Sequence, residues 1–151
     1  MQEILTNMEI YQGSLDSSKI YKTWYDKFNN ANCGALITFS GIVRDEGGIS
    51  ALSFDIYKPI LQSWYENWVK DAEKCGAYLL FAHSLGDVKI HECSYMSGVV
   101  SKQRKIALKL INDFVEDFKA NAPIWKYDVI NDKRIYAKER SHNLSNAGLL
   151  S

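Results

Sequence analysis

Cysteine and proline are scarce in this sequence of 151 residues, which has three cysteines and two prolines. Cys33, Cys75 and Cys93 are odd in number and widely spaced, with no C-x-x-C motif and no histidine pair at zinc-ligand spacing nearby. This pattern predicts a reducing compartment, with no bound metal and no other cofactor.

Signs of a division into domains are missing too. The sequence has no internal repeat, no low-complexity segment and no linker rich in proline or serine. A chain of 151 residues fits one domain, and its hydrophobic content of 46% is enough to bury a core. We therefore predict a single domain over residues 1–151, with a polar tail after about residue 140.

Long apolar runs and an excess of one charge sign are also absent. No stretch approaches the roughly 18 apolar residues of a membrane helix, and no basic region followed by an apolar run opens the chain. Lysine plus arginine and aspartate plus glutamate number 18 each, so no overall field draws the protein to nucleic acid or to an anionic membrane. These absences predict a cytoplasmic protein that binds neither.

Charge is nevertheless unevenly distributed along the chain. Residues 102–140 hold ten basic and six acidic side chains, whereas the rest of the chain holds eight basic and twelve acidic ones. Two interpretations fit this excess of positive charge: lysines that are simply solvated, or a local anion site in the last third of the chain.

Helical spacing of apolar residues recurs three times, each time beside a residue that can begin or end a helix. Asp16 can cap a first helix at its N-terminus. Pro59 begins a second helix, which Gly76 ends. The longest helix is expected over about residues 102–120 and is terminated by Pro123.

Apolar runs bounded by turn residues predict strands at residues 8–12, 34–43, 49–57, 77–83, 88–90, 94–101, 125–130 and 133–137. We expect the strands at 34–43 and 49–57 to be neighbours, and a turn at residues 85–87. Asn131 and Asp132 predict a tight hairpin. Hairpins separated by helices, without regular β-α-β alternation, indicate an α+β fold with a largely antiparallel sheet and about three helices.

Two places in the chain could bind an anion. Lys102, Arg104 and Lys105 put three positive charges at the helix end where the macrodipole is already positive, which either a bound anion or solvent screening can compensate. Arg44 follows an apolar strand and precedes a Gly-Gly pair, so it is either an ordinary turn residue or a guanidinium that closes over a ligand.

A pair of lysines is the best candidate for chemistry. Lys119 lies in the last turn of the longest helix, and Lys126 follows seven positions later, after a turn stiffened by Pro123 and beside Trp125. The two amines can converge near one aromatic wall. One would then act as a nucleophile or base while the other stabilises developing negative charge. The three histidines, among them His83, are scattered and are interpreted as structural.

Several motifs resemble the large, catalytic subunit of molybdopterin synthase over about residues 8–140. They are GALITFSGIVR (34–44), HSLGDVKIHE (83–92), the helix from Arg104 to Lys119 and, most specifically, KANAPIWKYD (119–128). The resemblance implies an α/β-hammerhead fold and a homodimer of large subunits. Two small ubiquitin-like subunits would dock at the outer ends of that dimer and complete a heterotetramer.

The resemblance also implies a sulfurtransferase activity in molybdenum cofactor biosynthesis. Each small subunit would insert a C-terminal Gly-Gly thiocarboxylate, and its sulfur would pass to cyclic pyranopterin monophosphate to make the dithiolene of molybdopterin. Because the sulfur arrives on the partner, no nucleophilic cysteine is required, which agrees with three cysteines in ordinary surroundings.

Roles for single residues follow from the same resemblance. Lys119 and Lys126 match the family's catalytic lysines, and Arg44 and Arg104 match its contacts to the substrate phosphate and pterin. One hypothesis places Arg104 at the site of the neighbouring subunit. Further matching substrate-binding positions are Ile42, Val43, Gln103, Tyr127, Asp128 and Arg140.

The sequence departs from the family pattern at several positions, among them Leu108 and Lys109, which replace a Phe-x-Ala pattern. Gln103 stands where the family usually has histidine, Ser84 where an arginine is common, and His91 where glycine is usual. Gln103 can hydrogen-bond a pterin edge but cannot carry a charge near neutral pH. Since both lysines and both arginines remain, we expect an active enzyme.

Two other functions are compatible with the residues alone. A non-catalytic module would dock a ubiquitin-like partner without chemistry. A single-stranded nucleic-acid binder would use stacked aromatics and the basic last third of the chain, although zero net charge argues against it.

Overall fold

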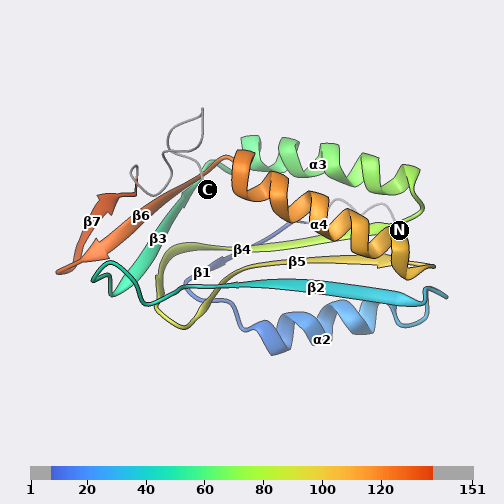
Figure 1. Ribbon diagram of the computed structural model, residues 1–151, viewed down its shortest axis with the longest axis horizontal. Coiled ribbons are helices and arrows are strands. Elements are labelled where there is room, and N and C mark those ends of the chain that lie inside the picture. The colour runs from blue at the N-terminus through green and yellow to red at the C-terminus, as the bar shows by residue number, and fades with distance from the viewer. Residues whose placement is uncertain (1–7, 138–151) are drawn as a thin grey trace.

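The computed structural model describes residues 8–137, which form three helices and a seven-stranded sheet (Figure 1). Every strand pair is antiparallel except β1 with β4, so the predicted α+β fold with a largely antiparallel sheet is confirmed. In chain order the elements are β1 (Glu9–Gln12), α2 (Ser17–Phe28), β2 (Ala35–Ile42), β3 (Ala51–Ile56), α3 (Lys58–Lys74), β4 (Tyr78–Lys89), β5 (Cys93–Ser101), α4 (Arg104–Asn121), β6 (Ile124–Ile130) and β7 (Lys133–Tyr136).

Strand β4 joins two parts of the sheet. Its first half pairs with β5 and β1, and its second half pairs with β3, so that the strand order is β2-β5-β4-β3-β6-β7. The predicted turn at residues 85–87 is wrong, because β4 continues through it. Gly86 has a φ of 83°, which costs a glycine little, and it begins the second half of β4, where it pairs with Phe54 of β3.

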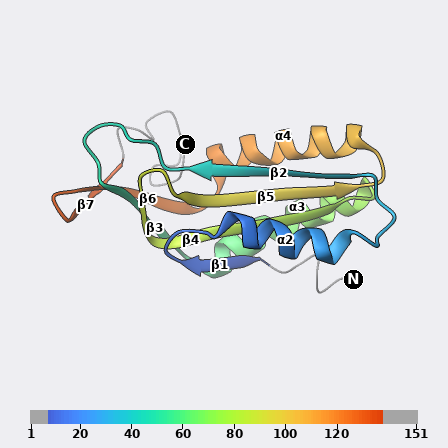
Figure 2. The same cartoon turned by 90° about the horizontal axis from the view of Figure 1, so that it is seen from below.

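Helices cover both faces of the β2-β5-β4 part of the sheet (Figures 1 and 2). Helices α3 and α4 lie on one face and bury the larger core, which includes Phe81, Val99 and Phe114. Helix α2 lies on the other face, where Trp24 is completely buried against the sheet. Asp16 caps α2 through its carboxylate, as its position predicts.

The expected pairing of the strands at 34–43 and 49–57 is wrong. Strand β2 pairs along its whole length with β5, whereas β3 pairs with β4 and β6. Alternating apolar residues predict that a strand forms but do not choose its partner. The connection over residues 43–50 carries the chain from one part of the sheet to the other (Figure 1).

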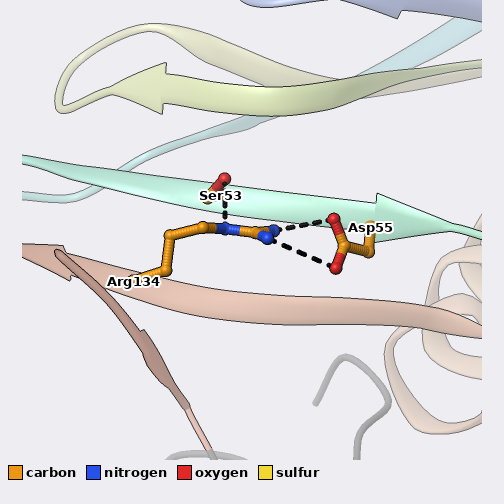
Figure 3. Close-up of polar contacts among 3 residues, drawn as sticks. All are labelled: Ser53, Asp55 and Arg134. Carbon is orange, nitrogen blue, oxygen red and sulfur yellow. Dashed lines mark hydrogen bonds and ion pairs between the residues drawn. The ribbon is translucent and has the colours of Figure 1, made fainter.

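Strands β3, β6 and β7 project beyond the helices at one end of the molecule (Figure 1). Asn131 and Asp132 both have positive φ angles, 51° and 62°, as in the two-residue hairpin predicted for them. Arg134 on β7 reaches across β6 to β3, where it donates hydrogen bonds to Ser53 and Asp55 (Figure 3). Within residues 8–137, no helix is long and apolar enough to cross a membrane.

Candidate functional site

A cavity of about 300 Å³ opens between the end of β2, strands β3, β4 and β5, the C-terminal turn of α4 and the start of β6. This volume is at the lower end of the range for small-molecule sites. The cavity brings together five of the residues predicted from the sequence, which are Ile42, Val43, Arg44, Lys119 and Lys126. The two lysines therefore do converge, as the spacing around Pro123 suggested.

Lys119 is positioned by contacts on two sides of the last turns of α4. The ring of Phe118 stacks on Tyr95 of β5, with centroids 3.8 Å apart and an interplanar angle of 11°. On the side facing α3, the Asp117 carboxylate accepts hydrogen bonds from the indole N–H groups of Trp64 and Trp68, at 3.1 and 2.7 Å. These contacts fix the end of the helix while the Lys119 side chain itself stays exposed.

Lys126 is positioned by a short, buried turn and by strand pairing. Ala122 and Pro123 form the whole connection between α4 and β6, and Ala122 is fully buried. Lys126 then pairs with Phe54 of β3, so both side chains lie on the face that lines the cavity. With only 9% of its surface exposed, Lys126 is the one lysine among residues 8–137 that is buried.

Aromatic side chains form the floor of the cavity, but Trp125, the aromatic residue that the sequence suggested, does not line it. Trp125 was expected beside the lysines, yet strand alternation turns it to the opposite face of β6 from Lys126. Aromatic side chains from four other elements take its place: Phe39, Phe54, Tyr95 and Phe118. Burial raises the pKa of the Tyr95 phenol, which donates its proton to Ser97 Oγ, so this group stays neutral.

The charge of the lining favours an anion. Three cations, Arg44, Lys119 and Lys126, face one carboxylate, that of Glu46. Arg44 forms a 3.2 Å ion pair with Glu46, with the Arg44 side chain 79% exposed. Such exposed pairs contribute little stability, so an anionic ligand can compete for the guanidinium at small cost.

His83 belongs to the same cavity, although sequence spacing left it as structural. His83 is 1% exposed, and its ring meets Phe54 edge to face, with centroids 4.9 Å apart. Burial lowers its pKa to about 4, so the imidazole is neutral at physiological pH. Nothing in the spacing of the three histidines could reveal this position, because the cavity is assembled from distant segments.

Gln103 and Arg104 do not reach this cavity within one chain. They lie at the N-terminus of α4, and Arg104 precedes Lys119 by 15 helical residues, which separates the two along the helix axis by about 22 Å. Gln103 occupies the N-cap position without a side-chain capping bond, and the first turn has no acidic residue. The positive charge predicted at this helix end is therefore not offset by a carboxylate in that turn.

The remaining predicted positions lie around or beyond the cavity. Tyr127 points away from it, since its ring stacks under the guanidinium of Arg134 at 4.0 Å. Asp128 is on the same face as Lys126 and pairs with Leu52, a lining residue, but does not itself line the cavity. Arg140 lies outside the described residues.

His91 has a φ of 71°, a conformation that glycine adopts freely and that suits the glycine of the family pattern that the sequence resembles. Within residues 8–137, no cluster of three or more histidine, cysteine, aspartate or glutamate side chains is placed to hold a metal ion.

Comparisons with known proteins agree on one family. The family model described as MoaE protein matches residues 12–121. The molybdopterin synthase catalytic subunit of Helicobacter pylori strain 26695 is 50% identical over 144 residues, covering 95% of this chain and 99% of that protein. The catalytic subunit from strain J99 of the same species is 42% identical over the same length and the same shares of the two chains.

Solved structures show the same fold. A protein–protein complex of subunits 1 and 2 of the molybdopterin-converting factor from Helicobacter pylori 26695 contains a chain that is 50% identical, with a TM-score of 0.88 over 95% of this chain and 99% of that one. Molybdopterin synthase from Staphylococcus aureus superposes with a TM-score of 0.74 over 85% of this chain and 95% of that one. Its 22% identity supports the fold alone.

Proposed function

The chain belongs to the MoaE protein family, and on that premise we propose that the cavity beside Lys119 and Lys126 is where it transfers sulfur. It is the catalytic subunit of a molybdopterin synthase, an enzyme of molybdenum cofactor biosynthesis. The proposed reaction moves sulfur from the C-terminal thiocarboxylate of a small ubiquitin-like subunit to cyclic pyranopterin monophosphate, which makes the enzyme a sulfurtransferase.

The convergence of two lysines from different elements in one cavity is the observation that carries this proposal. Lys119 ends a helix and Lys126 begins a strand, and the buried turn between them fixes their relation. Arg44 adds a third cation suited to a phosphate, while the aromatic floor suits a flat ring system. Phosphate, ring and thiocarboxylate are the three chemical features that the proposed substrates bring.

In the proposed reaction the thiocarboxylate sulfur attacks an electrophilic carbon of the substrate side chain and displaces an oxygen leaving group. The new thioester joins the substrate to the carrier. Water then cleaves its acyl C–S bond, so the carrier leaves as a carboxylate and the sulfur stays on the pterin. A second carrier repeats the sequence to complete the dithiolene.

The two lysines have complementary roles in these steps. A lysine ammonium stabilises the negative charge that develops on the acyl oxygen during thioester cleavage. A lysine in its amine form accepts the proton that the attacking water loses. Lys119, which is exposed, is assigned to meet the incoming carrier tail, and Lys126, which is buried, is assigned to the substrate inside the cavity.

The assembly is proposed from the same relatives. In Helicobacter pylori, subunits 1 and 2 of the molybdopterin-converting factor form a complex. We assign to this chain a small ubiquitin-like partner whose Gly-Gly tail enters the cavity, and a homodimer of large subunits within a heterotetramer. Gln103 and Arg104 would then serve the site of the neighbouring subunit, which accounts for their distance from Lys119 in one chain.

The other residues that match the family's substrate-binding positions keep the roles that the resemblance implies. Ile42 and Val43 would contact the substrate through the cavity wall, and Asp128 from beside it. Tyr127 and Arg140 stay assigned by resemblance only. The chain is taken as one domain over residues 1–151 in the cytoplasm, a location that its odd, widely spaced cysteines favour.

Substitution of the lysines tests the proposal. The assembled enzyme, with thiocarboxylated carrier and purified precursor, should convert the precursor to the dithiolene product, while Lys119→Ala lowers kcat by at least about a hundredfold, within the range for loss of a charge-stabilising group. Lys126→Ala should lower kcat strongly as well. Lys109→Ala, on the outer surface of the same helix, is the matched control and should keep wild-type turnover.

The same experiment separates the enzyme from a non-catalytic docking module. The module predicts that the wild type binds the carrier but consumes no precursor. Lys119→Ala should still bind the carrier, as measured by titration calorimetry. Wild-type turnover in the double Lys119→Ala, Lys126→Ala variant would refute the assignment of the site.

A further inference from the structure

One ring nitrogen in the floor of the cavity is buried without a hydrogen-bond partner among residues 8–137. His83 Nδ1 lies 2.7 Å from the carbonyl oxygen of Ser84. A carbonyl can only accept, so Nδ1 carries the ring proton of the neutral imidazole and donates it to Ser84. Nε2 is then an acceptor, and it has no hydrogen-bond partner among the residues that the structure describes.

The aromatic rings packed on His83 supply no donor for Nε2. The rings packed on it are Phe54, Phe81, Tyr95 and Phe118, with centroids 4.9 to 6.3 Å away. Tyr95 carries the only hydroxyl among these four, and it donates to Ser97. A buried acceptor left in this state costs about 1–3 kcal/mol, and native proteins keep few of them.

Because His83 lines the cavity, the missing donor can come from a bound ligand. We infer that His83 is a substrate-positioning residue whose Nε2 accepts a hydrogen bond from an N–H group on the edge of the substrate's pterin ring. This inference rests on the proposed function and deepens it. It predicts that the cavity selects substrates whose ring carries an N–H donor at the edge that faces His83.

The chemistry of the cavity favours a ring N–H over the other groups of the substrates. A phosphate presents oxygen lone pairs, which an acceptor nitrogen repels, and Arg44 and the two lysines attract it instead. A flat ring stacked on Phe54 would be steeply inclined to the imidazole, because the Phe54 and His83 rings meet at 84°, and this inclination allows an edge-on contact with His83. The pterin edge would thus face His83, and the phosphate would face the cations.

Access to Nε2 requires a small local movement. The atom exposes less than 1 Å² in the free protein, so a pocket side chain must turn aside when the ligand enters. Rotamer changes of this kind are common on binding. Burial also keeps the ring neutral, with a pKa of about 4, so the acceptor is available throughout the physiological range.

Two substitutions separate the effect of losing the hydrogen-bond acceptor from the effect of changing the shape of the side chain. His83→Leu removes the acceptor with an apolar side chain, while His83→Gln keeps an oxygen acceptor at the end of a side chain of similar reach. In the assembled enzyme, His83→Leu should raise both the Kd and the KM for the precursor by about tenfold, as expected for one lost hydrogen bond. Its kcat should change by much less, and His83→Gln should restore precursor binding to within about threefold.

A merely structural role predicts a different outcome. If His83 served packing only, substrate affinity would follow stability in both variants. Under the inference, His83→Leu lowers affinity out of proportion to its change in Tm, which combines the removal of an unsatisfied acceptor with the loss of the Nδ1 hydrogen bond to Ser84. Should His83→Leu fail to fold, His83→Met provides the same apolar replacement.

Three results are decisive. An unchanged precursor Kd and KM in His83→Leu overturns the inference, and so does a rise confined to the KM for the carrier, which would place the donor on the Gly-Gly tail. Loss of precursor affinity that His83→Gln does not restore also overturns it. Failure of the proposed function looks different, because the wild type itself would then convert no precursor.

Discussion

Acidification should destabilise this protein through His83, and the size of the effect follows from its burial. The side chain is 1% exposed, and its pKa falls from about 6.5 to about 4 on folding. Between these values the unfolded chain binds a proton that the folded chain does not, so the free energy of unfolding decreases as the pH falls. At about 1.36 kcal/mol per pKa unit, His83 lowers the free energy of unfolding by roughly 3 kcal/mol between pH 7 and pH 4.

The contribution of His83 is isolated by comparison with variants that cannot titrate. The free energy of unfolding of the wild type, His83→Leu and His83→Gln should be measured by urea denaturation from pH 7.5 to pH 4, at one protein concentration. Other groups contribute equally to all three curves. The wild type should therefore lose about 3 kcal/mol more than either variant, with the divergence beginning near pH 6.5.

A direct titration checks the same reasoning. The imidazole resonance of His83 in the folded protein should move with an apparent pKa of about 4. Parallel stability curves for wild type and variants, or a measured pKa near 6.5, would show that the ring is solvated. The account of a buried imidazole in the aromatic floor of the cavity would then fail.

Two other predictions concern how the site is held in place. Asp117→Ala leaves two indole N–H donors without their shared acceptor, so it should lower the free energy of unfolding in urea by about 2–3 kcal/mol. Asp113→Ala is the control, because it breaks only an exposed ion pair on the same helix, and it should lower this free energy by less than about 0.5 kcal/mol. Equal losses would show that the indole contacts do not anchor α4. Gly34→Ala would place a Cβ 2.8 Å from the backbone oxygen of Lys102 and should lower stability by about 1–3 kcal/mol, because two backbone segments must move apart. Gly41→Ala, whose Cβ would meet only ordinary contacts from 3.4 Å, is its control in thermal unfolding, and an equal drop in Tm would refute the argument.

Local structure was largely determined by the sequence. The Asp16 cap, Pro59 at the start of α3 and the Asn131–Asp132 hairpin each depend on neighbouring residues, and each forms as expected. The helical spacing of apolar residues likewise accounts for the buried side of α4, which runs from Ala107 to Phe118. These features were predictable because caps, turns and amphipathic spacing act over one or two turns of chain.

Strand pairing was decided by the tertiary structure. The run at 34–43 was recognised as a strand, but its partner is β5 rather than β3. Similarly, residues 85–87 have the composition of a turn, yet β4 runs through Gly86 because it has partners on both halves. Pairing depends on which distant strands complete the sheet, and turn propensity gives way to that constraint.

In the candidate site, too, some features were predictable from the sequence and others depended on the tertiary structure. The lysine pair was predictable because a rigid turn of a few residues connects Lys119 and Lys126. Trp125 was placed wrongly, since its side of β6 depends on the register with β3. The role of His83 could not be found at all from the sequence, because its neighbours Phe54, Tyr95 and Phe118 come from three other elements. Sequence alone determined the chemical groups of the site, whereas their burial and the missing partner of one nitrogen arise only when distant segments pack together.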